Sequence, residues 1–477
     1  MKSMLAKAHI RVGPACLIFA LLMGILSGCT GNSDSNTAAK ESADDSNGSA
    51  NTTMETVRVW TNDGSYKPIM DPIIEEYNKG EGIKDGIHIE YKVFGSDYND
   101  VLKIALAAGQ APELYKFVGT VKEPFISSGW MLPIDELPGG PEFLSTYKDI
   151  LINGYTTFGG KSYSVPYKVL STKFMYNKDL LKKSGFDAPP ATWDDVAAYA
   201  KKITNDNKGN AYGYGVHLKD SASSGKWYFA AQFASSVGHM GYDFTKGKFA
   251  FSDFTQNIQK ILQMKADGSI FPGGEGMDND ALMAQFAAGR IAMLPGVNWD
   301  VSTLDKFWKE IGSRFDLGVI DTPVMDPANK YKNYAQIADA LCIGPSAQEM
   351  PEKAMKVYAL FHSNKVLEDI QNNEVDFIAR QDIQAKAPAS FKKAGTAEFG
   401  NTSNSYLALT PPDGGITVEG QPYQNTIVNL IAGPANADVA AALGDLDKRY
   451  NSALDKAVSG GMDMSLYVNE NWDTRSK

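Results

Sequence analysis

The chain has 477 residues and a formal net charge of −10. This length is enough for two large domains with buried cores, and the acidic balance gives no basic patch of the kind that nucleic-acid binding requires. Of the three cysteines, Cys16 and Cys29 lie in an N-terminal segment described next, while Cys342 lies in an apolar run. We therefore expect a buried Cys342 thiol and no disulfide framework.

Residues 1–28 have the pattern of a secretory signal. Basic residues at positions 2, 7 and 11 precede an apolar run at 16–26, which is shorter than the roughly 20 residues that span a bilayer. The run ends in Leu-Ser-Gly before Cys29, which resembles the lipobox of bacterial lipoproteins. This resemblance implies that Cys29 becomes the mature N-terminus and carries a lipid anchor at the extracellular face of the cell membrane. The alternative is an ordinary secretory signal with a chance cysteine.

Residues 29–54 are predicted to be a disordered tether between the anchor and the folded body. The segment consists mainly of Ser, Asn, Asp, Thr, Gly and Ala, so it buries too little apolar surface to offset the entropy of ordering. A flexible linker of this composition would hold the folded body away from the membrane surface. The signal segment holds three basic residues and no acid, so the chain after it has a net charge of −13.

Strands and helices alternate in the part that follows. The expected elements are a strand at 57–60, a polar loop at 61–65, a helix at 66–78, a strand at 87–94, a helix at 98–108 and a strand at 113–118. This alternation predicts a parallel α/β sheet. Ligands of such sheets bind outside the carboxyl ends of the strands, so the loops after the strands are the first place to look for a site.

The second half of the chain repeats the mixture of helices and strands. The expected elements are a hairpin at 160–166, a strand at 174–177, a helix at 193–203, a polar turn at 205–210, helices at 227–237 and 280–288, a strand at 290–294, a loop at 295–300, a strand at 337–343, a helix at 351–363 and a helical remainder from 365. Thr192 is the expected N-cap of the helix at 193–203, and Asp195 completes an approximate capping box.

A series of segments in fixed order resembles the extracellular solute-binding proteins of ABC importers, in the group that includes maltose-binding protein. The segments are Val-Trp-Thr-Asn-Asp-Gly at 59–64, Tyr-Asn-Asp-Val at 98–101 with Ala-Pro-Glu at 111–113, Gly-Trp-Met-Leu-Pro-Ile-Asp at 129–135, Lys-Ser-Tyr-Ser-Val-Pro-Tyr at 161–167, Tyr-Asn-Lys-Asp at 176–179, Thr-Trp-Asp-Asp-Val at 192–196 and Phe-Ala-Ala-Gly-Arg through Trp at 286–299. Lys173 departs from the family pattern, which has a small residue there.

The resemblance implies an α/β architecture, the type II periplasmic-binding-protein-like fold, with two α/β lobes joined by a multi-strand hinge. Crossings near 165, 318 and 365 give an N-terminal lobe of 55–165 and 319–364 and a C-terminal lobe of 166–318 and 365–477. Ligand is expected in the cleft between the lobes of a monomer. Some relatives bind calcium in a loop such as 205–210, but Lys208 intrudes here and favours a solvated turn.

A sugar-binding site needs aromatic platforms for the apolar faces of the rings and polar groups for the hydroxyls. The candidate ligand contacts are Asn62, Asp63, Lys116, Trp227, Tyr228, Asn298, Trp299, Asp300, Tyr334, Asp339 and Tyr423. Trp299 is the favoured stacking residue, and core packing or capping is the alternative role at each position. Lys116, Lys168 and Lys173 could together bind an acidic sugar, or they could be solvated or salt-bridged.

The motifs give no indication of catalysis. The five histidines lack metal-ligand spacing, and the chain has no nucleophile elbow or Walker loop. Composition leaves open a carboxylate pair for glycoside hydrolysis. We expect a binding protein, without metal or cofactor, that delivers a carbohydrate to the permease subunits of an ABC importer. A peptide or polyamine ligand, or a sensory receptor without transport, is the alternative.

Overall fold

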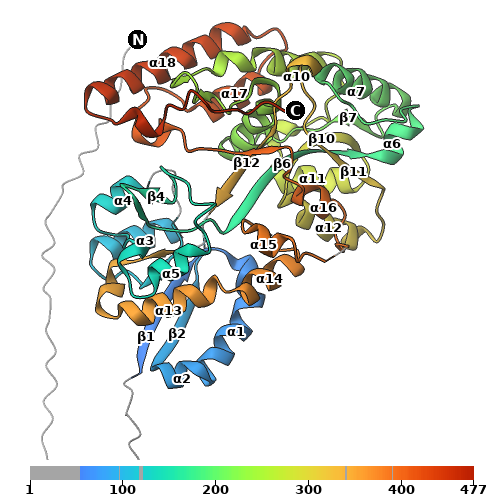
Figure 1. Cartoon of the computed structure of the whole chain (residues 1–477). Helices are drawn as coiled ribbons and strands as arrows, with labels where there is room; N and C mark the ends of the chain where they lie inside the picture. Colours follow the sequence, from blue (N-terminus) through green and yellow to red (C-terminus); the bar gives the residue numbers. More distant parts are fainter. Residues whose placement is uncertain (1–53, 96, 118–121, 339–340, 389, 477) are drawn as a thin grey trace, which may run out of the picture. The chain divides into compact units, whose positions relative to one another are not determined.

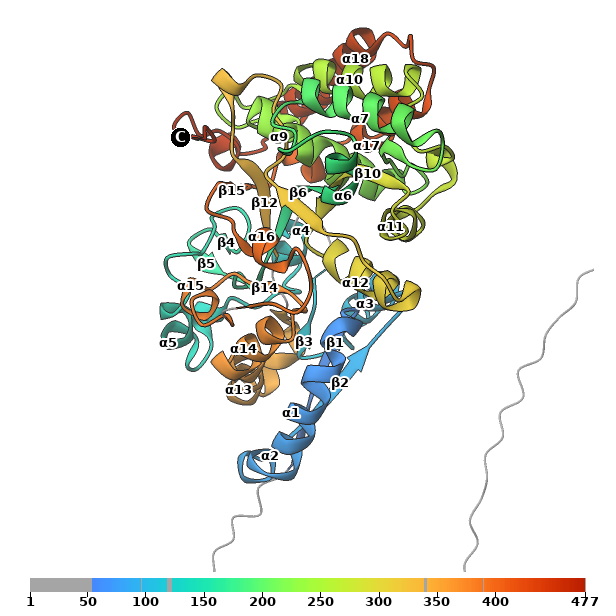
Figure 2. The ribbon, with the colours of Figure 1, turned by 90° about the vertical axis from the view of Figure 1, so that its right-hand side faces the viewer.

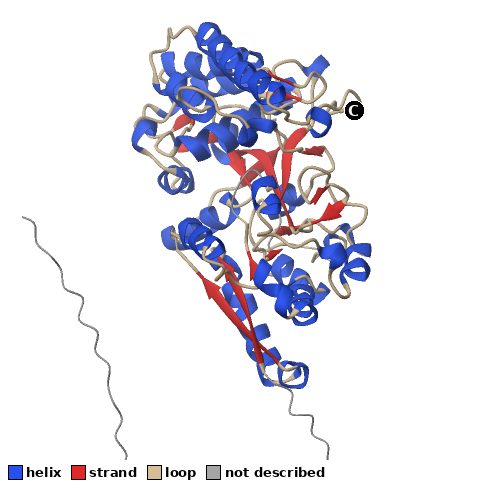
Figure 3. Cartoon of the chain, turned by 90° about the vertical axis from the view of Figure 1, so that its left-hand side faces the viewer, coloured by secondary structure: helices blue, strands red, loops and turns tan. Residues whose placement is uncertain are grey.

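A computed structural model describes residues 54–95, 97–117, 122–338, 341–388 and 390–476. Cys29, most of the expected tether and Asp339 lie outside the described residues. Within the described ranges, none of the helices combines the length and apolarity needed to cross a bilayer. Two sheets organise the described chain, and helices lie beside the strands of both (Figure 3).

The first sheet has four strands in the order β13-β3-β1-β2. Its strands are β1 (Glu55–Thr61), β2 (Ile87–Val93), β3 (Leu114–Tyr115) and β13 (Cys342–Ile343). The predicted parallel pairing is confirmed, because β1 pairs in parallel with both β2 and β3. Strand β3 is shorter than the predicted 113–118, and the Lys116 carbonyl oxygen just after it accepts a hydrogen bond from the Tyr98 hydroxyl at 2.6 Å.

Helices of the first lobe surround this sheet. They are α1 (Lys67–Lys79), α2 (Glu81–Asp85), α3 (Tyr98–Ala107), α4 (Glu123–Ser127), α5 (Gly140–Ser145), α13 (Pro351–Phe361), α14 (Asn364–Asn372) and α15 (Gln381–Gln384). A hairpin of β4 (Thr157–Phe158) and β5 (Lys161–Ser162) precedes the second sheet. Helix α1 lies along β1 and β2 (Figures 1 and 2), where Met70 and Ile74 join Val57 and Val59 in one buried core.

The second sheet is built around one long central strand, β6. Its seven strands are β6 (Lys168–Asn177), β7 (Tyr212–Tyr214), β10 (Ile291–Val297), β11 (Leu317–Ile320), β12 (Asn333–Ala338), β14 (Phe377–Ile378) and β15 (Ser405–Leu407). Strands β10, β11, β12 and β14 all pair antiparallel with β6. Nearly the whole of β6 is buried, so it forms the spine of the second lobe and its start lies next to the first (Figure 1).

The second lobe contains the longer helices. They are α6 (Lys178–Lys183), α7 (Trp193–Asn207), α8 (Ser221–Ser223), α9 (Ala231–Val237), α10 (Thr255–Ala266), α11 (Asn279–Ala287), α12 (Asp300–Ile311), α16 (Thr396–Gly400), α17 (Tyr423–Ala432) and α18 (Val439–Ser459), with a π-helical segment η3 (Ser224–Ala230) before α9 and a small hairpin of β8 (Tyr242–Asp243) and β9 (Lys248–Phe249).

The predicted capping box at the start of α7 is confirmed. The Asp195 N–H donates to Thr192 Oγ1 at 3.0 Å, and the Thr192 N–H donates to Asp195 Oδ2 at 2.9 Å. Helix α7 continues to Asn207, so the expected turn at 205–210 is partly helical. Asn207 Oδ1 accepts a hydrogen bond from Lys183 at 3.0 Å, so this side-chain oxygen is engaged within the protein. Within the described ranges, no group of His, Cys, Asp and Glu is arranged to hold a metal.

Two passages between the lobes differ from the expected positions. Strands β11 and β12 both pair with β6, so the chain returns to the first lobe after Ala338 rather than near 318. Val366 and Ile383 belong to the first core, whereas Phe399 belongs to a core of the second lobe. The last passage therefore lies after Ile383, not at 365. An amphipathic pattern identifies a buried helix face but not which of two cores buries it.

Candidate ligand-binding site

A pocket of about 150 Å³ lies between residues of the two lobes. Its polar and aromatic walls include Tyr155, Lys226, Tyr334, Gln336, Asp413 and Tyr423. Tyr155 comes from the first lobe, where its carbonyl oxygen accepts a hydrogen bond from Lys122 at 2.8 Å. The others come from the second lobe. The pocket therefore brings together Tyr334 and Tyr423, which the sequence predicted, with Lys226 and Asp413, which it did not.

Two half-buried tryptophans stand next to this pocket. The rings of Trp227 and Trp299 lie 5.2 Å apart at an angle of 84°, and Trp227 lies 5.9 Å from Tyr334 at 67°. Tyr406 continues the series at 5.9 Å from Tyr334. We call Trp227, Trp299, Tyr334 and Tyr406 the aromatic cluster. Edge-to-face packing of this kind holds each ring by its neighbour, so the cluster offers preformed aromatic surface to a ligand.

Two hydrogen bonds in series, through buried side chains, hold the Trp299 indole ring in place. The Trp299 Nε1–H donates to the Tyr228 hydroxyl at 2.9 Å, and that hydroxyl donates to Asp300 Oδ1 at 2.9 Å. Tyr228 is 2% exposed and Asp300 0% exposed. Both were expected to contact ligand directly. The structure instead gives them a positioning role, because their polar atoms are taken up in orienting the indole ring.

Asp300 occupies the first position of α12, and donors surround its carboxylate. The Val297 N–H donates to Oδ2 at 2.8 Å, and Asn279 Nδ2 donates to Oδ1 at 2.7 Å. Burial raises the pKa of Asp300 to about 6, and the bonds from Val297, Asn279 and Tyr228 oppose that shift. A carboxylate at a helix N-terminus is also favoured by the helix dipole. The group is therefore held ionised near neutral pH inside the protein.

Asn298 also has a different role from the expected one. It is 6% exposed. Its N–H donates to the Ser171 carbonyl at 3.1 Å, while its Oδ1 accepts from the Ser171 N–H at 3.2 Å. Asn298 thus extends the pairing of β10 with β6 by one residue. The expected loop at 295–300 is in fact the end of β10 followed by the start of α12, because Asn298 and Asp300 satisfy the backbone groups there.

The π-helical segment η3 places Lys226 in the wall of the pocket and Trp227 next to it in sequence. Gly225 precedes them, and a Cβ atom at this position would lie 2.5 Å from the Cα of Gln424 in α17. A glycine is therefore required for α17 to pack this closely on η3. The sequence predicted a helix at 227–237, but a widened π turn, which is frequent at functional sites, has no periodicity signal that could have identified it.

Lys226 and Asp413 supply opposite charges inside the pocket. Burial lowers the pKa of the Lys226 ammonium, with Asp413 acting in the other direction. Burial likewise raises the pKa of the Asp413 carboxyl, opposed by Lys226. The ammonium lies 4.9 Å from the centre of the Trp227 ring. Within the described residues neither side chain forms an ion pair, so both remain able to bind hydroxyl groups.

A second polar group lies where the start of β6 meets the first lobe, and we call it the charged cluster: Asp63, Lys116, Lys168, Asp376 and Tyr66. Asp63 Oδ2 lies 2.7 Å from the Lys116 ammonium and 4.0 Å from that of Lys168. Lys168 lies 2.8 Å from Asp376, which also accepts from the Tyr66 hydroxyl at 2.5 Å. Although burial alone would raise it, Lys168 and Lys116 hold the pKa of Asp63 below its usual range.

The ion pairs of Lys116, Lys168 and Lys173 decide whether these lysines are free to bind an acidic sugar or are salt-bridged. Lys116 and Lys168 are paired as described, and Lys173 pairs with Asp321 at 2.6 Å. The salt-bridged alternative is therefore confirmed, and these lysines are not the free cations that an acidic sugar would need. Asn62 is exposed next to Asp63. It stays a prediction as a ligand contact, as does Asp339, which is outside the described residues.

Comparison with known proteins identifies the family. Residues 61–365 match the model for bacterial extracellular solute-binding proteins. The chain belongs to this family. The melibiose/raffinose/stachyose-binding protein MelE of Bacillus subtilis is 21% identical over 319 residues, which cover 66% of this chain and 68% of MelE. The sn-glycerol-3-phosphate-binding periplasmic protein UgpB of Brucella abortus is 25% identical over 245 residues, or 48% of this chain and 54% of UgpB.

Solved structures establish the fold of this solute-binding protein. RafE from Streptococcus pneumoniae, in its apo form, superposes with a TM-score of 0.63 at 17% identity, covering 84% of this chain and 98% of RafE. RafE in complex with raffinose gives 0.61, with 84% and 100% covered. The chain therefore has the type II periplasmic-binding-protein-like fold. Family members of this kind are binding proteins rather than enzymes.

Proposed function

We propose that this chain is the lipid-anchored receptor of an ABC importer, and that it binds an oligosaccharide between its lobes and delivers it to the permease. The observation that carries the proposal is the pocket of about 150 Å³ whose walls combine Tyr334 and Tyr423 with Lys226 and Asp413. Aromatic surface suits the apolar faces of sugar rings, while a cation and a carboxylate suit their hydroxyls. The named ligands of MelE and RafE support a saccharide.

A calorimetric ligand panel tests the class of ligand. The full chain is titrated with melibiose, raffinose, stachyose, malto- and xylo-oligosaccharides, sn-glycerol 3-phosphate, a tripeptide and spermidine. We expect binding to a saccharide series alone. A ligand at 100 times its dissociation constant also raises the free energy of unfolding by about 2.7 kcal/mol, which a melting curve resolves. Binding of the tripeptide or spermidine alone would overturn the carbohydrate assignment.

A matched pair of variants links binding to this pocket. Trp227→Ala removes a ring beside the pocket, whereas Tyr199→Ala removes a half-buried ring that stacks on Phe186 in the same lobe. We expect Trp227→Ala to weaken saccharide binding by about 10-fold or more, as for an aromatic anchor, and Tyr199→Ala to leave it unchanged. Equal losses in the two variants would place the saccharide elsewhere.

Ligand that contacts both lobes favours the closed arrangement over the open one, so binding shifts the population between them. Small-angle scattering should therefore show a smaller radius of gyration with saturating saccharide. An unchanged radius would contradict hinge closure.

Cys29 is the proposed attachment site of the lipid. Metabolic labelling with a palmitate analogue should mark the wild-type chain but not Cys29→Ser. The variant should also appear in the medium or periplasm instead of the membrane fraction, because several acyl chains at about 0.8 kcal/mol per buried CH₂ are needed for stable anchoring. Saccharide uptake by cells should fall in Cys29→Ser while binding to the isolated chain is retained. Labelling of the serine variant would place the lipid elsewhere.

A further inference from the structure

The pocket of about 150 Å³, which we call the interlobe pocket, contains two opposite charges that do not pair with each other. Lys226 and Asp413 both line it, and within the part of the chain that the structure describes neither side chain forms an ion pair. Burial lowers the pKa of Lys226 and raises that of Asp413, and each charge opposes that shift in the other. The two groups are therefore near enough to interact without being in contact.

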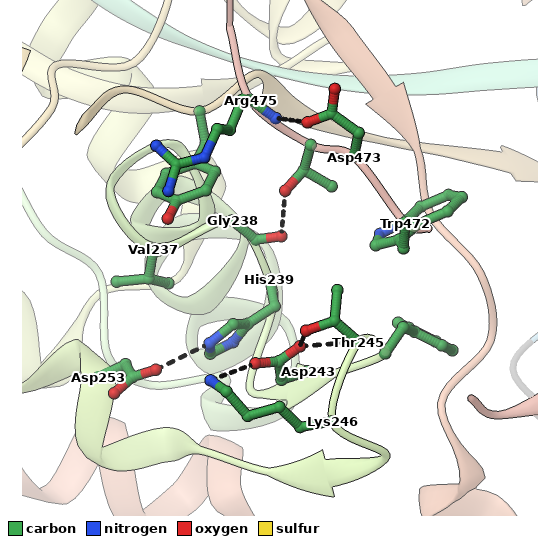
Figure 4. A pocket seen from close by; sticks show the side chains of 13 residues that line it. Val237, Gly238, His239, Asp243, Thr245, Lys246, Asp253, Trp472, Asp473 and Arg475 are labelled. Carbon is green, nitrogen blue, oxygen red and sulfur yellow. Dashed lines mark hydrogen bonds and ion pairs between the residues drawn. The ribbon is translucent and has the colours of Figure 1, made fainter. Parts of the chain in front are cut away.

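A cavity of about 290 Å³ in the second lobe shows the opposite arrangement (Figure 4). The Lys246 ammonium lies 2.7 Å from Asp243 Oδ2, and His239 Nε2 lies 3.0 Å from Asp253 Oδ2. These four side chains satisfy one another inside the protein. The two charges of the interlobe pocket differ from them, because they remain available to a ligand that enters the pocket.

Close packing of η3 on α17 fixes the backbone that carries Lys226. A Cβ atom at Gly225 would lie 2.5 Å from the Cα of Gln424, so the two segments are in close contact next to Lys226. Just before η3, the Ser221 hydroxyl donates to Asn425 Oδ1 at 2.7 Å and ties the same segments together. The Lys226 ammonium lies 4.9 Å from the centre of the Trp227 ring, whose face attracts a cation. The ammonium thus rests on the indole ring instead of on Asp413.

Asp413 lies near the aromatic wall of the interlobe pocket. It follows two successive prolines and belongs to the 3-10 segment η8 (Pro412–Gly415), where the prolines restrict the backbone by fixing φ. Burial first, and then the Asp413 carboxylate, raise the pKa of the Tyr334 and Tyr423 hydroxyls. Both tyrosines line the same pocket. A sugar unit in contact with this wall would therefore meet the carboxylate as well.

Two separate charges of opposite sign select a ligand by the charge of the unit that contacts them. A hydroxyl group accepts a hydrogen bond from an ammonium and donates one to a carboxylate, so a neutral sugar unit can satisfy both groups. A carboxylate on that unit would be attracted by Lys226 and repelled by Asp413, and an ammonium group would meet the reverse. Since a charge that loses water without gaining a partner is costly, the arrangement favours a neutral unit.

We propose that Lys226 and Asp413 are specificity-determining residues that restrict the sugar unit in the interlobe pocket to an uncharged one. Asp413 excludes a uronic acid, and Lys226 excludes an amino sugar that carries an ammonium group. We call this selection the charge filter. The inference rests on the proposed function and deepens it, because it names the class of sugar unit that this pocket accepts.

Calorimetry on the full chain tests the charge filter with charged derivatives of raffinose, stachyose and maltotriose. In each probe, the primary hydroxyl of one sugar unit at a time is oxidised to a carboxylate or replaced by an amine. For one unit of a saccharide that binds, both charged forms should bind the wild-type chain at least about 10-fold more weakly than the neutral form. At that same unit, Asp413→Asn should restore binding of the carboxylate form only, and Lys226→Met that of the amine form only.

Binding of a neutral saccharide gives a second measurement, which any saccharide of the calorimetric panel that binds can supply. Lys226→Met and Asp413→Asn should each weaken this binding by about 10-fold, as for a lost hydrogen bond to a charged group. The double variant should lose less than the product of the two single losses, because both charges contact one sugar unit.

Lys246→Met is the matched control. It removes a lysine that lines the cavity in Figure 4 and pairs with Asp243, so it should leave every affinity within about twofold. If one pocket variant fails to fold, the other decides, because each tests one sign of charge. Rejection of charged forms that persists in the variants, or single losses that multiply in the double variant, would overturn the charge filter while the proposed function stands. No binding of any saccharide to the wild-type chain would overturn both.

Discussion

The charged cluster of the first lobe and the aromatic cluster of the second are built on different principles. In the charged cluster, ionic groups satisfy one another: Lys168 lies 2.8 Å from Asp376, and Lys116 lies 2.7 Å from Asp63. In the aromatic cluster, two half-buried tryptophans pack on two buried tyrosines, and the polar groups that orient Trp299 are the buried side chains of Tyr228 and Asp300.

The difference indicates how the two lobes divide the work of recognition. Paired ions hold each other in place and leave little net charge, so under the proposed function we expect the charged cluster to favour neutral ligands over ionic ones. The aromatic cluster supplies contact area from rigid side chains with little conformational entropy to lose. A neutral, hydroxyl-rich ligand with apolar ring faces matches this combination, and a small anion such as a glycerophosphate does not.

The largest expected effect is on the charged cluster. Lys168 has a side chain only 14% exposed between Asp376 and Asp63. Lys168→Met leaves Asp376 without its cation and Asp63 with Lys116 alone, so the free energy of unfolding should fall by about 3 kcal/mol. Urea denaturation followed by circular dichroism measures this. Lys178→Met breaks an exposed pair with Asp316 and should change stability by only about 0.5 kcal/mol. Similar values for the two variants would show that the cluster is not a stabilising network.

The contribution of the buried Asp300 carboxyl to the free energy of unfolding should depend on pH. Its pKa is about 6 in the folded chain, above the value near 3.9 of an unfolded Asp. Between these values the folded state binds more protons than the unfolded state, so stability falls as pH rises. The contribution to the free energy of unfolding should drop by about 2 kcal/mol from pH 4 to pH 6.

The measurement is the difference between wild type and Asp300→Asn in denaturation at each pH, since other carboxyls cancel. Asp63, whose pKa is lowered, contributes with the opposite sign and is the same in both proteins. A wild-type profile parallel to that of Asp300→Asn would show that Asp300 keeps an ordinary pKa.

Ligand affinity should depend more on the aromatic cluster than on the charged one. Trp299 is half-buried and held by Tyr228, so its ring is preorganised for stacking. Trp299→Ala should weaken saccharide binding by about 30-fold, or about 2 kcal/mol. Lys116→Ala should weaken it by less than about fivefold, because its ammonium is already engaged by Asp63 at 2.7 Å. Calorimetry on both variants compares the clusters directly, and a larger loss in Lys116→Ala would reverse their ranking.

The sequence could predict those parts of the fold and site that depend on local pattern. The parallel pairing of β1 with β2 and β3 followed from alternating elements. Trp227 and Trp299 were identified from the family resemblance, as aromatic residues beside a helix start and a strand end. The packing of their two rings, 5.2 Å apart, is a long-range contact that the sequence did not predict.

The rest depends on contacts between distant segments. Lys226 and Asp413 approach the same pocket from opposite ends of the second-lobe sequence, and Asp413 lies in a stretch rich in Pro and Gly without periodicity. Asp300 is fully buried and its sequence neighbour Trp299 only half-buried, because the first turn of α12 directs the carboxylate inward to the Val297 N–H. Residue type and local pattern do not show which of Asp300 and Trp299 is the more buried, since both residue types suit a loop at the end of a strand.

The smallest expected effect on stability is that of removing one tyrosine hydroxyl, which we compare at two positions. Tyr228→Phe removes a hydroxyl that donates to Asp300 at 2.9 Å and accepts from Trp299 Nε1 at 2.9 Å. It should lower the free energy of unfolding by about 1 kcal/mol. Tyr406→Phe removes a hydroxyl without a partner among the described residues and should leave that free energy equal or slightly higher. Because the two variants lose the same atom from rings that are both buried, their difference isolates the hydrogen bonds that the Tyr228 hydroxyl makes to Trp299 and Asp300. Equal stability of the two would mean that the rings hold one another without help from Asp300.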